Sequence, residues 1–516
     1  MSDEKKKTRY ALLHVADRTG ITEFGYALHE LGYTLVSSGG TASALRQAEL
    51  EVVEARELVD GAAGPLGLLH PGIIGGITVD RDDPLQRGDL ERAGGVPFDL
   101  VVVNLYPLAQ LTDDVKLSQA EVLDYVDLAS SSLLRAAALN FRHVACVCDP
   151  EDYQPVLDSL RQYDRVHPER RQTLAAKALH YGAYYDTTVA QFLGGKWDKL
   201  PDELVIGLKK TAEMHYGENP QQQGALYTLS GARPWGINAA QLLFGKPLSY
   251  NHYLDLEVAW ELVTEIGEPA CAIVKHAVPA GVASSERLAE AARLAYRGDP
   301  RGCFRGTAAV NRELDQDAAA FFAEEYVACI AAPQFSHGAL MVLRAKKDIR
   351  LVTLASTLIS AHELDFRSVA GGVLVQDKDN QIFGSPRAVT RRPPSELEMK
   401  SLRLAWQIAK HARSHAAVIV RGPHAIGIGS GQTARLDALR LAVVKSQERH
   451  PILPAGLPLV LASDGALSAE HVLEAAHAGV TAIIQPGGTF EDPDAIAAAD
   501  EKAVAMVFTG IRHFRH

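Results

Sequence analysis

Short apolar runs alternate with helical stretches along roughly the first two hundred residues, and this alternation constrains the fold more than any other feature. Residues 10–15, 35–36, 100–103 and 144–148 have the composition of buried strands. Between the first two, residues 21–31 carry apolar side chains at helical spacing. Strands that alternate with helices pair in parallel, because each helix crosses over one face of the sheet. The first part of the chain is therefore expected to be a parallel α/β domain.

A long helical pattern over residues 172–192 closes this part of the chain. Gly194 and Gly195 follow it, as glycine commonly does at a helix C-terminus, and polar residues continue to Pro201. We therefore predict two domains, residues 1–199 and residues 200–516. The second is long for a single core, so two α/β subdomains are expected within it. Its buried-strand patterns lie at residues 270–274, 416–420, 459–461, 482–484 and 503–508, with no evident tandem repeat.

The charge balance excludes some classes of function. With 52 Lys and Arg against 63 Asp and Glu, the formal net charge is −11, so a broad basic surface for nucleic acid or anionic lipid is not expected. No apolar run reaches the length of a membrane span, and no apolar region follows the lysines at positions 5–7, so a signal peptide is not expected. The five cysteines form no CxxC pair, which favours a reducing cytoplasm over a disulfide framework or a structural zinc site.

A glycine-containing loop with the composition of an anion site follows the second predicted strand. Ser38, Gly39, Gly40 and Thr41 lead into a helix that is expected to begin near Ala42. Free backbone N–H groups at a helix N-terminus, with hydroxyls beside them, can hold a phosphate or a carboxylate. The alternative is a tight turn followed by a helix cap, which needs no ligand. A second loop, residues 427–432, lacks the GxGxxG spacing of a dinucleotide site.

Lys275 and His276 follow the apolar strand at residues 270–274. The ligands of open α/β sheets usually bind at the carboxyl ends of strands. An ammonium group there can stabilise developing negative charge, and an imidazole can move a proton near neutral pH. The alternative is an ordinary strand end. No metal site is expected, because His411 and His415, at helical spacing, have no further ligand nearby.

Eight segments of the chain, found together and in the same order, resemble the bifunctional AICAR transformylase/IMP cyclohydrolase family of purine biosynthesis. The resemblance covers essentially the whole chain. The segments are Ser-Gly-Gly-Thr-Ala at 38–42, Leu-His-Pro at 69–71, Val-Val-Val-Asn-Leu-Tyr-Pro at 101–107, Tyr-Gly-Glu-Asn-Pro at 216–220, Val-Lys-His-Ala at 274–277, Gly-Ile-Gly at 427–429, Ile-Gln-Pro-Gly-Gly at 484–488 and Arg-His-Phe-Arg-His at 512–516.

The resemblance implies a fold and a pair of reactions. It implies an N-terminal methylglyoxal-synthase-like parallel α/β domain, a C-terminal transformylase of two cytidine-deaminase-like α/β/α subdomains, and an intertwined homodimer. The transformylase of this family moves a formyl group from 10-formyltetrahydrofolate to the 5-amino group of AICAR, without a metal. The cyclohydrolase then closes the product, FAICAR, to IMP with loss of water. Small molecules, and neither nucleic acid nor a membrane, are the partners implied.

The same resemblance implies roles for particular residues. His276 is similar to the group that takes the proton from the attacking amine, and Lys275 to the group that stabilises the oxyanion or protonates the folate. In the first domain, Tyr106 and Asp127 resemble the polar groups around the closing ring, with residues 38–41 near the phosphate. The implied nucleotide-binding residues of the second domain are Tyr216, Gly217, Asn219 and Arg512.

The chain departs from the family pattern at both implied sites. The Ser-x-Ser-Asp-Lys-Thr-Gly loop of relatives is His-Val-Ala-Asp-Arg-Thr-Gly at residues 14–20, so both serines are absent. An Arg and a Lys of relatives are absent around Leu66, and Leu139 replaces a further Lys. Lost charge-assisted contacts each cost about 1.5–3 kcal/mol, so we expect a weak, absent or redirected cyclohydrolase. In the second domain, His215, Gln221, Val278, Ala280, His415 and residues 465–468 also differ from the pattern.

These departures leave three functions open. The first is formyl transfer to AICAR, with or without cyclisation to IMP. The second is formylation or cyclisation of another amine in specialised metabolism. The third is a silent paralogue that binds folate or nucleotide as a scaffold. The Lys275–His276 pair favours an enzyme, whereas the altered surroundings favour divergence of the acceptor.

Overall fold

The computed structural model describes residues 8–59, 65–108, 118–194, 200–230, 235–355, 363–448 and 456–516. The chain forms two compact units. Unit 1 comprises residues 1–209 with 228–233, and unit 2 comprises residues 210–227 with 234–516. Within the described ranges, no helix has the length and apolar composition needed to cross a membrane.

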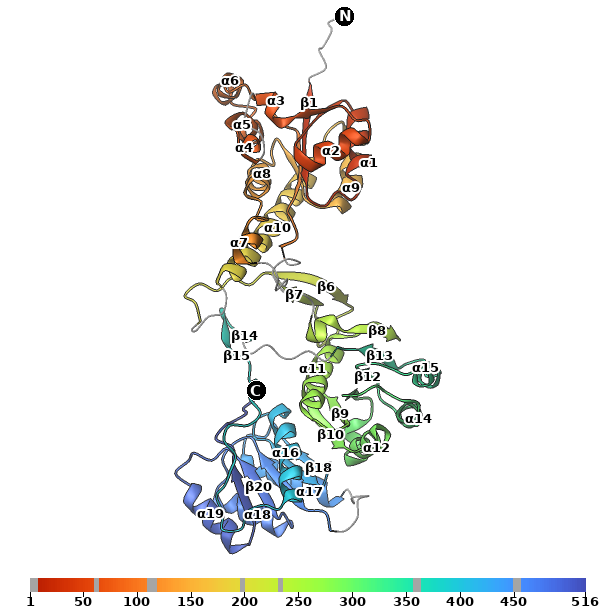
Figure 1. The fold of residues 1–516 in the computed structure, drawn as a ribbon, viewed down its shortest axis with the longest axis vertical. Helices are drawn as coiled ribbons and strands as arrows, with labels where there is room; N and C mark the ends of the chain where they lie inside the picture. The colour runs from red at the N-terminus through yellow and green to blue at the C-terminus, as the bar shows by residue number, and fades with distance from the viewer. Residues whose placement is uncertain are drawn as a thin grey trace, which may run out of the picture. The chain divides into compact units, whose positions relative to one another are not determined.

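Unit 1 is built on a five-stranded parallel sheet, as the alternation of strands and helices predicts (Figure 1). The second and third strands lie on one side of β1, and the fourth and fifth lie on its other side. The direction in which successive strands are added therefore reverses beside β1. Ligands of such sheets bind at the carboxyl edge beside this reversal. In spatial order the strands are β3 (Val52–Glu54), β2 (Tyr33–Ser37), β1 (Arg9–Val15), β4 (Leu100–Asn104) and β5 (Ala145–Val147).

Helices cover both faces of this sheet, because its strands present apolar side chains alternately to either side. One face packs on α1 (Ile21–Glu30), α2 (Gly39–Gln47) and α9 (Tyr153–Tyr163), where the rings of Phe24 and Tyr153 stack with centroids 4.3 Å apart. The other face packs chiefly on α5 (Pro71–Thr78), α8 (Leu128–Leu139) and α10 (Pro168–Gly194). Further helices among the described residues are α3 (Ala55–Val59), α4 (Pro65–Leu68), α6 (Pro84–Arg92), α7 (Gln119–Leu123) and the 3-10 turn η2 (Pro150–Asp152).

Unit 2 contains one twelve-stranded mixed sheet made of two halves with the same topology. Each half has a tight antiparallel hairpin, a strand antiparallel to its first member, two further parallel strands and an antiparallel edge strand. The first half consists of β10 (Val278–Ser284), β9 (Ala270–Lys275), β11 (Thr307–Val310), β12 (Cys329–Ala332), β13 (Arg350–Thr353) and β8 (Gln241–Phe244); the second consists of β18 (His424–Gly429), β17 (Ala417–Arg421), β19 (Leu459–Ser463), β20 (Ala482–Gln485), β21 (Ala505–Phe508) and β16 (Arg387–Ala388).

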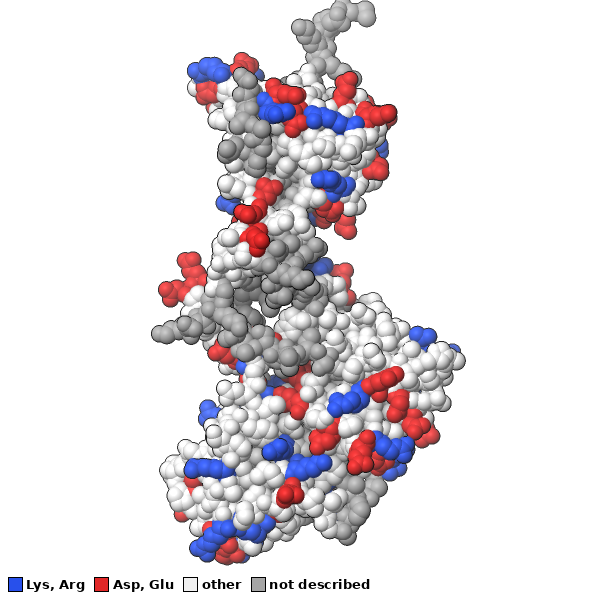
Figure 2. All heavy atoms as spheres, viewed as in Figure 1, with Lys and Arg blue, Asp and Glu red and all other residues white. Residues whose placement is uncertain are grey.

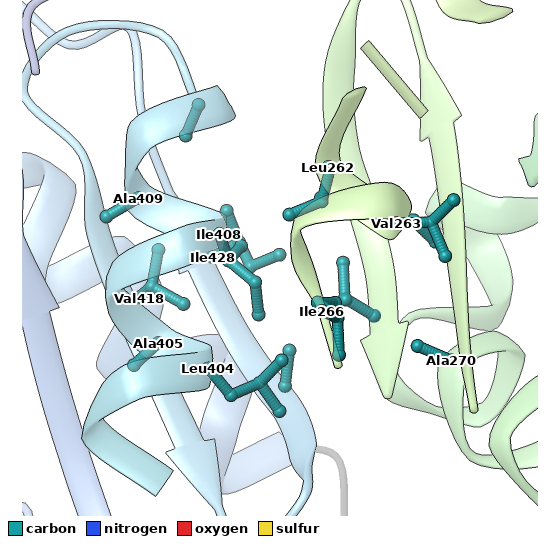
Figure 3. Packing of buried hydrophobic residues seen from close by; sticks show 14 of the residues in the cluster. Leu262, Val263, Ile266, Ala270, Leu404, Ala405, Ile408, Ala409, Val418 and Ile428 are labelled. Atoms are coloured by element: carbon teal, nitrogen blue, oxygen red, sulfur yellow. The ribbon is translucent and has the colours of Figure 1, made fainter. Parts of the chain in front are cut away.

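Two long helices join these halves. On one face of the sheet a shared core packs α11 (Tyr250–Glu265) against α16 (Glu396–His411), with Leu262 opposite Ile408 and Ile266 opposite Leu404 (Figure 3). The strands themselves meet through the single residue pair Ala283–His424. On the other face each half has a core of its own. These cores include α12 (Leu288–Gly298), α13 (Pro300–Cys303), α14 (Gln316–Glu324) and α15 (His337–Leu343) in the first half, and α17 (Arg435–Glu448), α18 (Ala469–His477) and α19 (Asp492–Glu501) in the second.

Unit 2 is one compact unit, and the two predicted subdomains stay a prediction. Its sheet does have two halves with a common topology, which sequence inspection missed. The halves share strand order and not sequence, so no tandem repeat was visible. Two hairpins lie outside the large sheet: β6 (Leu208–Met214) with β7 (Gly224–Leu229), and β14 (Leu364–Val369) with β15 (Gly372–Asp377). The 3-10 turn η3 covers Gly236–Ala239. On the face shown in Figure 2, acidic and basic side chains are interspersed.

Candidate functional sites

The carboxyl edge of unit 1 has a loop held by a buried asparagine. Asn104, the last residue of β4, accepts hydrogen bonds from Ala16 N (2.7 Å) and Asp17 N (2.9 Å), and its amide donates to Asp17 O (2.9 Å). Thr41 Oγ1 accepts from Val15 N and donates to Val15 O, both at 3.0 Å. These contacts bring the ends of β1, β2 and β4 to one place, where sheets of this kind bind ligands.

The predicted anion loop forms the first turn of α2. The helix begins at Gly39, three residues earlier than the sequence pattern predicts, with Ser38 at its N-cap and no capping bond from the Ser38 side chain. The first N–H groups of a helix have no intrahelical partner and can face an anion. A Cβ atom on Gly40 would lie 2.0 Å from Arg18 Nη2, so the guanidinium packs directly on this glycine. The loop therefore combines backbone donors with a cation.

The Ser38 hydroxyl turns instead toward an imidazole. Ser38 Oγ lies 3.3 Å from His14 Nδ1, and His14 Nε2 lies 4.0 Å from Asp127 Oδ2. Asp127 is the N-cap of α8 and accepts from Ser130 N at 2.8 Å, which orients its carboxylate. Burial lowers the pKa of His14, although the Asp127 charge opposes this effect. A neutral imidazole between a hydroxyl and a carboxylate can accept a proton near neutral pH.

The other expected residues of unit 1 lie at different distances from this edge. Tyr106, two residues beyond β4, is 37% exposed, and its ring centroid lies 5.2 Å from that of Tyr125. Leu139 is 66% exposed at the far end of α8, twelve residues from Asp127. Twelve residues of helix rise by about 18 Å, so within one protomer the change at Leu139 is remote from the Asp127 edge. Gly64 and the Leu66 side chain lie outside the described residues.

In unit 2, Lys275 ends β9, and His276 and Ala277 form the two-residue turn to β10. Both turn residues have left-handed backbones, with φ of 57° and 56°. Such a backbone costs a non-glycine residue about 1–2 kcal/mol. The matching turn of the second half uses Gly422, with φ of 58°. A strained histidine at the place where the matching turn has a permissive glycine points to a functional constraint on the first turn.

Two contacts hold this turn. Ala277 N donates to Asp255 Oδ1 of α11 at 2.7 Å, and Lys275 Nζ donates to Phe304 O at 2.8 Å. Burial raises the pKa of Asp255 to about 6, against the opposing effects of the Ala277 N–H group and of the charges of His276 and Lys275. His276 itself is exposed, so its imidazole is accessible to a ligand.

The position of this pair corrects one expectation from the sequence. Lys275 does end an apolar strand, but β9 runs antiparallel to β11. The pair therefore lies beside the amino ends of β11, β12 and β13, and the rule for parallel sheets does not place it. An isolated apolar run does not show in which direction its neighbours run, so the sequence could not reveal this.

A cavity of about 380 Å³ opens at the same amino ends. Arg305 follows Phe304, the residue whose carbonyl binds Lys275, and its guanidinium lies 5.6 Å from the Tyr326 ring centroid. Arg305 has a φ of 60°, another left-handed backbone. Burial, together with the nearby Arg350 charge, lowers the pKa of His252 to about 4. The lining residues are Lys246, His252, Arg305, Tyr326, Ala328, Asp348 and Arg350. The three Lys and Arg side chains outnumber the one carboxylate.

The predicted nucleotide segment lies near the start of α11. Gly217 N donates to Gln222 O at 2.8 Å, and Asn219 N and Nδ2 donate to Gln222 Oε1 at 2.9 and 3.0 Å, which fixes the loop. Asn251 Nδ2, in the first turn of α11, donates to Glu218 O at 3.4 Å. Tyr216 is 39% exposed. The loop and the Lys275 turn therefore attach to successive turns of one helix.

Arg512 belongs to a different part of unit 2. Its guanidinium stacks on the Phe514 ring, with Cζ 4.2 Å from the centroid. Arg515 N donates to Ser414 Oγ at 2.9 Å, which anchors the C-terminal segment to the second half. The contacts of the described residues do not connect Arg512 with Lys275.

Sequence reasoning missed Asp255, Arg305 and Arg350. Asp255 carries no local motif, and only its contact with the Ala277 N–H group reveals it. Among the described residues, Asp80, Asp82 and His143 have ligand atoms within 4.8 Å of one another, a further grouping that sequence inspection did not identify. Both carboxylates are exposed, and His143 Nε2 lies 3.1 Å from Asp80 Oδ1, so this grouping is accounted for by an ordinary ion pair.

Two family models match parts of the chain, and curated relatives match nearly its whole length. The family model described as AICARFT/IMPCHase bienzyme matches residues 137–445, and that of the MGS-like domain matches residues 20–126. Proteins named bifunctional purine biosynthesis protein PurH are 39% identical in Persephonella marina (98% of this chain, 100% of the relative) and 42% identical in Chloroflexus aurantiacus (100% of each). A solved structure titled "Crystal structure of ForH" is 31% identical over 36% of this chain and 100% of its own, with a TM-score of 0.33.

The raised pKa of Asp255 predicts a pH dependence of stability. Because its folded pKa of about 6 exceeds the ordinary value of 3.8, the native state binds more protons between these values. The free energy of unfolding of unit 2 should then fall as pH rises through this window, by up to about 3 kcal/mol. Asp255→Asn, which keeps an acceptor oxygen, should remove this fall in urea titrations at pH 4.5 and 7. Asp437→Asn, at an exposed position on α17, should leave it, and an unchanged fall in Asp255→Asn would contradict the assignment.

Proposed function

The chain belongs to the AICARFT/IMPCHase bienzyme family, and on this basis we propose that it transfers the formyl group of 10-formyltetrahydrofolate to the 5-amino group of AICAR. The observation that carries the proposal is the strained His276 turn, held beside Lys275 and next to a cation-lined cavity. Residues 200–516 would form the transformylase and residues 1–199 a cyclohydrolase-like domain. We also propose a homodimer in the cytoplasm, on the family resemblance alone.

The proposed chemistry needs a base and a cation at one carbonyl carbon. The amine attacks the formyl carbon while His276 accepts its proton, and the carbonyl oxygen becomes an oxyanion. An ammonium group has three N–H donors, so Lys275 can keep its bond to Phe304 O and still donate to that oxyanion. Collapse of the tetrahedral intermediate releases tetrahydrofolate, whose nitrogen takes up a proton. The acceptor is a weakly nucleophilic aromatic amine, so positioning supplies much of the rate.

The cationic lining of the cavity beside this pair favours an anionic formyl acceptor. Lys246, Arg305 and Arg350 suit the phosphate of a ribonucleotide, since guanidinium groups bind phosphate in a bidentate manner. Tyr216, Gly217 and Asn219, attached to the same helix, are proposed as further contacts to the nucleotide. Arg512 is proposed to meet the substrate phosphate by resemblance only, because no contact within the described chain brings it to Lys275.

We further propose that the cyclisation of FAICAR to IMP is weak or redirected. His14 and Ala16 stand where the family has serines, and they flank the loop that Asn104 orients at the carboxyl edge. Loss of two hydroxyl donors weakens phosphate binding, while the His14–Asp127 pair introduces an acid–base group. Ser38, Gly39, Gly40 and Thr41 remain the proposed phosphate contacts, and Tyr106 and Asp127 the proposed groups beside the ring.

His276→Ala is expected to lower the rate of formyl transfer at least about 100-fold, the lower range for loss of a general base. Purified protein would be assayed with AICAR and 10-formyltetrahydrofolate, with tetrahydrofolate and FAICAR followed separately. His477→Ala, on the exposed end of α18, is the matched control and should retain the wild-type rate. Equal rates in His276→Ala and wild type would remove this imidazole from the mechanism.

The same assay separates the alternatives. Turnover only with another amine would support a diverged acceptor, and folate binding without turnover of any amine would support a silent scaffold. Either result would overturn formyl transfer to AICAR.

Arg305→Ala is expected to raise the KM for AICAR by about 10-fold or more, because one charge-assisted contact is worth about 1.5–3 kcal/mol. The KM for the folate should change little, since the cavity binds the nucleotide in this proposal. Arg301→Ala, an exposed position four residues earlier, serves as the control. A rise in the folate KM alone would instead assign the cavity to the folate.

Restoring both serines should strengthen the cyclohydrolase. His14→Ser combined with Ala16→Ser is expected to raise the rate of IMP formation from FAICAR at least about 10-fold, because two hydroxyl contacts to a phosphate are regained. IMP is measured by its absorbance change, with Ala93→Ser, at an exposed position, as the control. Efficient IMP formation by the wild type, unimproved by the double substitution, would refute a weakened cyclohydrolase.

A further inference from the structure

Unit 1 has a second polar cavity at the opposite edge of its sheet. A cavity of about 550 Å³ is lined by Arg9, the first residue of β1, by Tyr33, the first residue of β2, and by Asp99, which immediately precedes β4. Ser38 and Asp127 lie at the carboxyl ends of these parallel strands, so the cavity is separate from the candidate site described above. None of the expected site residues lines it.

Arginine dominates the charged lining of this cavity. Arg9, Arg81, Arg165 and Arg171 face two carboxylates, Asp99 and Asp164. Each carboxylate already binds one arginine: Arg9 Nη1 donates to Asp164 Oδ1 at 2.8 Å, and Arg81 Nη1 donates to Asp99 Oδ1 at 2.7 Å. Within the described part of the chain, no side-chain hydrogen bond or ion pair is found for Arg165 or Arg171. These two guanidinium charges are therefore left without a counter-ion among the described side chains.

Arg171 is the most informative of these residues. Its Nε atom is buried and has no hydrogen-bond partner, and the same holds for Arg81 Nε. Burial lowers the pKa of Arg171, and the charges of Arg81 and Arg165 add to this effect. A cation held near two other cations, with a buried donor unsatisfied, destabilises the fold unless an anion offsets it. Ion pairs account for Arg9 and Arg81, but no side-chain contact within the described residues accounts for Arg165 and Arg171.

We propose that this cavity binds a small phosphate-bearing anion through Arg165 and Arg171. The cavity volume lies in the range of about 300–1,000 Å³ that is typical of small-molecule sites. A phosphate dianion would balance two guanidinium charges and accept bidentate hydrogen bonds from them. A phosphate, a pyrophosphate and a sugar phosphate share this chemistry. The proposal stands independently of the reaction proposed above, because it uses none of the same residues.

The test is isothermal titration of the full chain with inorganic phosphate, pyrophosphate and ribose 5-phosphate, which distinguish the possible sources of the phosphate group. Arg171→Gln should weaken binding at this site by about 10-fold or more, in line with the loss of one charge-assisted contact. Arg170→Gln, the exposed neighbour in the same turn of α10, is the matched control and should bind as the wild type. Arg165→Gln, at an exposed position, gives a second variant if Arg171→Gln fails to fold.

Hydrogen exchange locates the bound anion. Residues 164–174 should gain protection on addition of the tightest of the three anions, and should lose this gain in Arg171→Gln or Arg165→Gln. Protection confined to residues 38–42 would mean that the anion binds only the carboxyl-edge loop, and would overturn the proposal. Equal weakening by Arg170→Gln, or no binding of any of the three anions, would overturn it as well.

Discussion

The hydrogen bond from Ala277 N to Asp255 Oδ1 is the contact on which the transformylase-like site depends. It ties a two-residue turn with two left-handed residues to the long helix α11. The carboxylate is half-buried, and burial raises its pKa to about 6. The same helix anchors the Tyr216 loop through Asn251. One helix thus sets the relative positions of the imidazole, the ammonium group and the loop proposed to hold the nucleotide.

The duplicated topology of unit 2 explains why only one of its hairpin turns looks functional. The turns after β9 and β17 occupy equivalent places in the two halves. The second turn has Gly422, which adopts a φ of 58° without strain, whereas the first has His276 at nearly the same angle. Structural need alone would favour glycine at both. The difference between two copies of one motif therefore supports the proposed role of the first turn without reference to any relative.

Sequence patterns predicted the elements well because apolar periodicity depends only on local burial. The strand before Lys275 and the parallel sheet of unit 1 are examples. Strand direction, in contrast, depends on pairing between distant segments, so the edge that carries Lys275 was misplaced. Asp255 and Arg305 were missed for the same reason. Neither belongs to a local sequence motif, and only the fold brings each of them near the turn. The remoteness of Leu139 from Asp127 also emerges only once the helix between them is known.

The shared core between α11 and α16 has a consequence for biosynthesis. A nascent chain leaves the ribosome N-terminus first, and its domains tend to fold in that order. The apolar face of α11 stays uncovered until residues 396–411, which form α16, have been synthesised. During that interval Leu262 and Ile266 lack the side chains that enclose them in Figure 3. The first half of unit 2 therefore exposes this apolar face until synthesis has passed residue 411.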